Sequence, residues 1–173
     1  MRRATFLAAL LLAWLAMLPA ARADDLPEYR LKAAFVYNFL AYTDWPADTG
    51  TTLTLCLRTP EPFGREIDGL QGKPVGTRTL AVQRRGPGES LKGCHAVFLP
   101  AAALEVPSRV IEPLRESPVL TLADTPGAMR RGVMLNMTLL NGKVSFEANL
   151  QAARAAGLGL SAKLLRLASE VQQ

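Results

Sequence analysis

Apolar residues along this chain follow a helical spacing in some segments and form short strand-like runs in others. Between positions 27 and 42 they recur every three or four residues, as on one buried face of an amphipathic helix, at Leu31, Ala34, Phe35, Phe39 and Tyr42. Four later runs, at residues 52–57, 77–83, 96–99 and 119–123, predict strands. The third run is short and apolar at every position, which is typical of a central strand in a parallel sheet.

Helical segments are expected between these strands. Residues 63–70 predict a short helix after the turn around Pro60 and Pro62. Residues 101–114 predict a helical stretch that Pro107 and Pro113 interrupt. The alternation of strands and helices favours an α/β fold.

The strongest turn signal in the chain is Asn141-Gly142, because both residues tolerate a positive φ. It separates the runs 133–140 and 143–148 and predicts an antiparallel hairpin that closes the sheet. Residues 149–156 predict a helix, and the leucines from Leu160 to Leu167 predict a last amphipathic helix. We therefore expect a single-domain mixed β-sheet flanked by helices, with a C-terminal β-hairpin and amphipathic helix.

The first 23 residues match a cleavable signal peptide. Arg2 and Arg3 precede an apolar run from Phe6 to Leu18, and the Ala-Arg-Ala sequence at 21–23 supplies the small residues of a cleavage site. The alternative is a membrane anchor, but about 13 apolar residues are fewer than the roughly 20 that span a bilayer. We expect residues 24–173 to be one exported domain, soluble in a bacterial periplasm and not inserted in the membrane.

Charge argues against a nucleic-acid partner. Removal of the signal segment takes Arg2, Arg3 and Arg22 from the 20 basic residues, which leaves 17 against 15 acidic ones. The remaining cations are scattered pairs beside turns, without the interleaved aromatic residues of a single-strand binder. A solvated surface is the better interpretation.

Cys56 and Cys94 are the two cysteines of the chain. In an oxidising compartment a single disulfide between them is the simplest prediction, and it would tie together two segments that read as strands. The alternative is two buried free thiols. Redox catalysis would need a closer spacing, such as Cys-x-x-Cys.

The sequence offers little catalytic chemistry. His95 is the only histidine, which excludes a multi-histidine metal site and leaves one candidate for a general base. It stands between Cys94 and an apolar run, so a structural place on a buried strand is favoured over catalysis. Asp124 follows a predicted strand, and a solvated or capping role is expected for it. We predict no enzyme activity, no catalytic residues, no metal and no cofactor.

The order and spacing of several short motifs resemble the YfiR family of periplasmic proteins. The motifs lie at residues 28–35, 37–39, 45–46, 55–57, 62–64, 93–95, 142–150, 152–154 and 160–165, and together they span the mature chain. The resemblance places the family's cysteine pair on Cys56 and Cys94, in agreement with the disulfide predicted from the residues. A second, C-terminal cysteine pair found in YfiR has no counterpart here.

The resemblance implies a non-enzymatic regulator that represses an inner-membrane diguanylate cyclase, a YfiN-like protein, by binding its periplasmic domain. It also implies that a YfiB-like, OmpA-like outer-membrane lipoprotein sequesters the regulator. A homodimer is left open. The alternative function is a periplasmic small-molecule-binding protein that serves another membrane sensor or receptor, since loops at strand ends can form a crevice.

Partner-binding residues are expected where the resemblance is densest, around the hairpin and the helix that follows it. We predict contacts by Leu135, Glu147 and Asn149. Alternation along a strand places Phe146 and Glu147 on opposite faces, so Glu147 is the preferred outward residue, with a carboxylate available to an arginine of the partner. The alternative is that Glu147 stabilises the N-terminus of the following helix by its charge.

Overall fold

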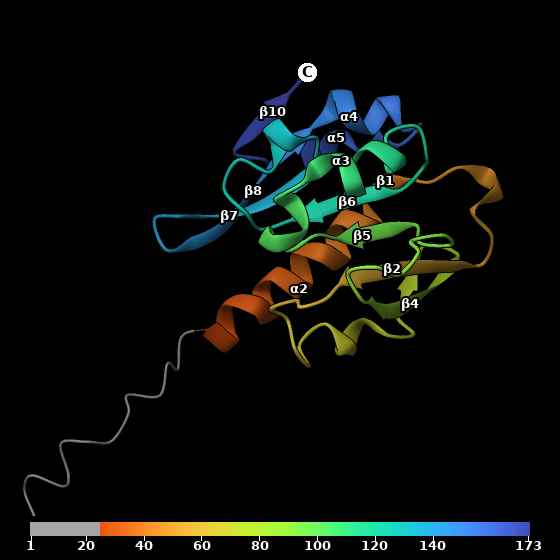
Figure 1. Cartoon of the computed structure of the whole chain (residues 1–173), viewed down its shortest axis with the longest axis horizontal. Helices are drawn as coiled ribbons and strands as arrows, with labels where there is room; N and C mark the ends of the chain where they lie inside the picture. Colours follow the sequence, from red (N-terminus) through yellow and green to blue (C-terminus); the bar gives the residue numbers. More distant parts are fainter. Residues whose placement is uncertain (1–24) are drawn as a thin grey trace, which may run out of the picture.

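The structure is a computed structural model that describes residues 25–173 (Figure 1). The predicted signal peptide and its cleavage site lie outside the described residues. The helices are α2 (Asp25–Ala41), α3 (Pro107–Val110), α4 (Leu150–Ala155) and α5 (Ala162–Leu165), with 3-10 turns η1 (Ala47–Thr49), η2 (Asp68–Leu70), η3 (Ala101–Leu104), η4 (Glu112–Leu114) and η5 (Met129–Arg131).

Most strands belong to one mixed sheet. Its members are β2 (Thr52–Arg58), β3 (Pro74–Val75), β4 (Arg78–Arg85), β5 (Ala96–Phe98), β6 (Leu120–Ala123), β7 (Leu135–Leu140), β8 (Lys143–Asn149) and β10 (Glu170–Gln172). Their order across the sheet is β10-β8-β7-β6-β5-β2-β4-β3. The strands from β4 through β2, β5 and β6 to β7 are parallel to their neighbours, and β7 pairs antiparallel with β8. The predicted α/β class and the parallel centre are confirmed.

Two short strands outside this sheet pair with each other. β1 (Thr43–Asp44), just after α2, pairs antiparallel with β9 (Gly159–Leu160), just before α5. Gly159 is suited to this contact, because a Cβ there would lie 2.8 Å from a carboxylate oxygen of Asp44. The C-terminal segment is thereby fixed next to the end of α2.

The central strands are apolar on both faces, so the sheet has a cover on each side. On one face Leu55, Phe98 and Leu122 pack in a cluster with α2. On the other face Cys56 and Val97 belong to a second cluster, which the short helices and turns between residues 101 and 133 cover. The long helix therefore covers one face, and irregular structure covers the other.

The buried face of α2 differs from the predicted one. Leu31 is 47% exposed and Ala34 is also exposed, whereas Val36 and Leu40 are fully buried. Phe39 is buried as predicted, and its ring lies 5.0 Å from that of Phe146 on β8. Because apolar residues occur almost all around this helix, their spacing fits more than one buried face, and packing against the sheet selects between them.

The end of the chain also differs from the prediction. The expected amphipathic helix is only the four-residue α5, which Ser161 caps by accepting a hydrogen bond from the Leu164 amide at 3.2 Å. The following residues form β10, which pairs parallel with β8 from Glu170 to Gln172. Strand pairing satisfies backbone groups at the edge of β8, and that gain outweighs the local helical pattern.

Two other segments that were predicted as helices are less regular in the structure. The predicted helix at 63–70 is a series of turns that ends in the 3-10 turn η2, and the stretch 101–114 is divided among η3, α3 and η4. None of the described helices is long and apolar enough to cross a membrane.

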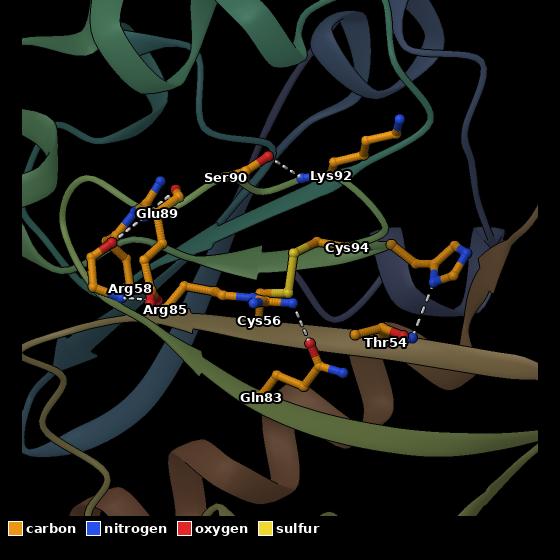
Figure 2. The surroundings of a disulfide bond; sticks show 11 residues. Thr54, Cys56, Arg58, Gln83, Arg85, Glu89, Ser90, Lys92 and Cys94 are labelled. Atoms are coloured by element: carbon orange, nitrogen blue, oxygen red, sulfur yellow. Dashed lines mark hydrogen bonds between the residues drawn. A yellow bond between two sulfur atoms is a disulfide. The ribbon is translucent and has the colours of Figure 1, made fainter.

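A disulfide joins Cys56 of β2 to Cys94, just before β5, with 5.8 Å between the two Cα atoms. Both cysteines are buried in the second cluster. Figure 2 shows the bridge between the two strands, on the face that lacks a long helix. The pairing predicted from the sequence is present, and it closes a loop over a sequence separation of 38.

We expect the bridge to stabilise the fold. Cys56→Ala should lower the free energy of unfolding by about 2–4 kcal/mol, since loss of the cross-link frees the unfolded chain. Urea unfolding measures the effect, and reduction of the wild-type protein should lower its stability to a similar level. The double variant with Cys94→Ala should be insensitive to reductant. Two titratable thiols in denatured, unreduced protein would contradict the prediction.

Candidate functional site

Two adjacent exposed leucines, Leu139 and Leu140, lie at the carboxyl edge of the parallel strands. Pairing between β6 and β7 stops at Asn136, opposite Ala123, the last residue of β6. The rest of β7 and the start of β8 continue past this edge as a hairpin, which Figure 1 shows projecting from the sheet on the same side as the first turns of α2. Ligands of α/β sheets commonly bind at this edge.

The projecting end of the hairpin, which we call the hairpin tip, consists of residues 138–143. Leu139 and Leu140 are 54% and 56% exposed. No charged residue occurs on β7, and on its β6 side the strand has no partner beyond Asn136. Exposed strands usually carry charges or prolines that prevent pairing. The β7 part of the hairpin tip lacks them, and Lys143 at the start of β8 is the one charged residue of the tip. The exposed leucines of β7 are therefore a candidate interaction surface.

A charged cluster at the same edge anchors α2. The Lys32 ammonium lies 2.8 Å from an oxygen of Asp124, which follows β6, and 2.6 Å from an oxygen of Glu28, one turn earlier on α2. The Tyr29 hydroxyl donates to the same Asp124 oxygen at 3.1 Å. The side chains of Lys32 and Asp124 are only 6% and 10% exposed. A buried cation is tolerated here because two carboxylates surround it.

The electrostatics of this cluster keep Lys32 charged. Burial is the largest influence and lowers the pKa of Lys32, but the hydrogen bonds to Asp124 and Glu28 outweigh it, so the pKa is raised. Burial, then the negative charge of Asp124, raises the pKa of Tyr29, which therefore stays a neutral hydrogen-bond donor. Lys32 stays charged and Tyr29 stays neutral, and both are bound to the carboxylate of Asp124. These groups are therefore better suited to fixing α2 in place than to transferring protons near neutral pH.

A second polar contact links the loop after β6 to the hairpin. The Asn136 side chain accepts a hydrogen bond from the Thr125 amide at 3.1 Å and donates one to Glu147 at 2.9 Å. Asn136 is fully buried, whereas Glu147 is half-buried. Glu147 thus has one oxygen in a structural bond on the face of β8 opposite to Phe146.

The other two residues predicted to contact a partner have internal roles. Leu135 is fully buried, in the cluster beneath α2. Asn149 is 6% exposed, and its side chain caps α4 by accepting from the Ala152 amide at 2.9 Å. Their positions in the sheet keep both out of a contact surface, because alternation points Leu135 at the core and the helix start consumes the Asn149 oxygen. Of the three residues, Glu147 alone is partly accessible.

Sequence reasoning missed both Leu139 and Lys32. The exposure of Leu139 could have been predicted from the sequence. Two consecutive leucines before Asn141-Gly142 break the alternation of a strand, so at least one of them must face solvent. The partner of Lys32 could not be found in the same way, since Asp124 is 92 residues away.

His95 has the structural role that the sequence favoured. Its Nδ1 accepts a hydrogen bond from the Thr54 amide at 3.0 Å, and its own amide donates to the Thr54 carbonyl at 2.9 Å. Figure 2 shows Thr54 on the strand that carries Cys56. Burial, and then the positive charge of Arg78, lowers the pKa of His95. A neutral imidazole that accepts from a backbone amide holds β2 beside β5.

We find no candidate metal-binding site in the part of the chain that the structure describes. No group of three or more His, Cys, Asp or Glu side chains is placed there to hold a metal ion. What the carboxyl edge offers is an exposed apolar hairpin tip beside a rigid charged cluster, an arrangement suited to binding another protein.

Comparison with known proteins places the chain in a family. The profile of the YfiR/HmsC-like family matches residues 29–169. No curated protein matches the chain. Among solved structures, a conserved domain protein from Vibrio cholerae O1 biovar El Tor is similar in fold, with a TM-score of 0.53 and 8% sequence identity. The match covers 83% of this chain and 60% of that one.

The charged cluster should matter greatly for stability. Lys32→Met leaves Asp124 buried without its cation, and we expect the free energy of unfolding to fall by about 3–5 kcal/mol. Arg30→Met is the matched control, because it removes a neighbouring cation of α2 that is exposed and paired with Glu66; its unfolding midpoint should barely change. Equal effects of the two substitutions in urea unfolding would contradict a special role for Lys32.

The His95 contact predicts a pH dependence. Because the folded-state pKa lies below the ordinary value of 6.5, the unfolded chain binds the proton more readily. The stabilising contribution is therefore fully present above pH 6.5 and is lost as the pH falls through the folded-state pKa. His95→Gln keeps an acceptor for Thr54 and should reduce the loss of thermal stability between pH 7.5 and pH 5.5. An unchanged pH dependence would argue against this contribution.

Proposed function

The chain belongs to the YfiR/HmsC-like family, and we propose that it represses an inner-membrane diguanylate cyclase by binding the cyclase's periplasmic domain. At the level of the family, membership implies a periplasmic regulator of cyclic di-GMP signalling rather than a catalyst. Beyond this, we propose that the regulator represses its target and that the target is a diguanylate cyclase. Family membership over 29–169 is the observation that carries it.

The hairpin tip is the surface that we assign to the partner. Leu139 and Leu140 are more than half exposed, and the β7–β8 hairpin that carries them projects from the sheet (Figure 1). Burial of these two leucines at an interface would stabilise a complex, because a fully exposed leucine contributes about 1.5–3 kcal/mol when it is removed from water, and a half-exposed one contributes roughly half of that. Glu147, behind the tip on the same hairpin, can add a carboxylate to the contact while its other oxygen holds Asn136.

Repression across the membrane needs only differential binding. If the protein binds the inactive conformation of the sensor more tightly than the active one, a difference of about 1–3 kcal/mol changes the equilibrium by roughly 5- to 150-fold. An OmpA-like outer-membrane lipoprotein that competes for the same regulator would then release the cyclase. In this scheme neither partner requires the regulator to perform a reaction.

Deletion of the gene tests the direction of control. Loss of the repressor should raise intracellular cyclic di-GMP and biofilm formation, and deletion in a strain that also lacks the partner cyclase should have no effect. An unchanged cyclic di-GMP level after the single deletion would reject the cyclase as the target and leave another membrane sensor to test.

Complementation of the deletion strain tests the surface. The variant Leu139→Lys/Leu140→Lys should be exported at the normal level but fail to lower cyclic di-GMP. Leu167→Lys is the matched control, because Leu167 is 65% exposed but lies after α5; this variant should restore repression. Glu147→Gln keeps the acceptor for Asn136 and should weaken repression less than the tip variant. Full repression by the tip variant would exclude the hairpin tip as the contact.

A further inference from the structure

A pocket lies on the face of the sheet away from α2. It has a volume of about 440 Å³, which is within the usual range of roughly 300–1,000 Å³ for small-molecule sites. Its walls come from the irregular segment around η4 and η5 on one side and from α4 on the other. Buried apolar side chains form much of the lining, among them Ile111, Met129 and Met134.

Two buried polar side chains also line this pocket. Thr121 is 1% exposed and Asn149 is 6% exposed. Each uses an oxygen as acceptor for a backbone amide, Thr121 from Met134 at 3.0 Å and Asn149 from Ala152 at 2.9 Å. Among the described residues, no acceptor is found for the Thr121 hydroxyl proton or for the Asn149 amide group. Two donors are therefore left for an acceptor within the pocket.

The lining includes charged side chains of both signs. Arg115, Arg130 and Glu116 contribute to it. Arg115 is paired with Glu112 at 2.9 Å, whereas Arg130 forms no ion pair within the residues that the structure describes. Gly127 makes room for Arg130: its φ is +75°, and a Cβ there would lie 2.9 Å from a guanidinium nitrogen. The local backbone thus accommodates a cation beside the pocket that has no internal counter-ion.

We propose that this pocket binds a small organic anion with an apolar body. The apolar walls would bury the body, the donors of Thr121 and Asn149 would meet an oxygen of the ligand, and Arg130 would balance its charge. The chemistry is that of an aryl-alkyl or alkyl carboxylate. The site lies apart from the hairpin tip, so its test is independent of the proposed repression.

Three probes that share one apolar body test the charge preference. They are 4-phenylbutyrate, 4-phenylbutan-1-ol and 4-phenylbutylamine, titrated into the ¹⁵N-labelled protein and followed by NMR. The carboxylate should shift the amides of Gly132, Gln151 and Ala152 in a saturable way. The alcohol should bind about five- to tenfold more weakly, because it loses the charge-assisted contacts, and the amine more weakly still.

Substitutions test which residues produce the preference for the carboxylate. Arg130→Gln should lower the affinity for the carboxylate to that for the alcohol and leave the alcohol unaffected. Arg65→Gln is the matched control, since Arg65 is exposed and outside the lining, and it should change neither. Ala152→Trp should fill the pocket and abolish binding of both, with its own NMR spectrum showing whether the fold is retained.

Several outcomes would overturn the proposal. They are equal affinity for the three probes, shifts centred outside the pocket, an unchanged selectivity in Arg130→Gln, or no saturable binding of the carboxylate below about 10 mM. Continued binding to a folded Ala152→Trp variant would also place the ligand elsewhere.

Discussion

The structure depends on the need to cover a sheet that is apolar on both faces. Strands β5 and β6 are buried along their whole length and β2 is buried from Leu53 onward, and a parallel sheet of this kind is stable only when both faces are removed from water. Helix α2 covers one face by aromatic packing of Phe35 and Phe39 on Phe146. The other face is covered by short helices and turns, and there the Cys56–Cys94 bridge supplies a covalent tie.

The position of α2 explains why a charged cluster is buried. A helix with apolar residues on most of its surface offers more than one face that could pack against the sheet. Lys32 selects one of them, because its ammonium can reach Asp124, which follows β6, only when this side of α2 is turned toward the sheet. An ion pair with so little exposure contributes modestly to net stability, since desolvation offsets its attraction. Its effect is to make one packing of the helix much better than the alternatives.

Local sequence patterns were enough to predict the elements whose patterns are strong. The apolar run at 96–99 and the Asn141-Gly142 turn predicted a central strand and a hairpin, both of which are present. Elements that depend on distant partners were not predictable in this way. β10 forms because β8 has a free edge, and Lys32 of α2 is buried because it meets Asp124, which follows the distant strand β6. Partner-binding residues were the hardest to predict. The alternation of side chains along a strand assigns each residue to one face of the sheet, but it does not show which face other elements leave uncovered.

The hairpin tip and the pocket lie at opposite ends of the same strand. On β8, Glu147 bonds to Asn136 near the carboxyl edge, and two residues later Asn149 lines the pocket and caps α4. Both side chains point to the face opposite Phe146 and Ala148, which pack beneath α2. A ligand would affect docking only if it bound one arrangement of β8 and α4 better than another.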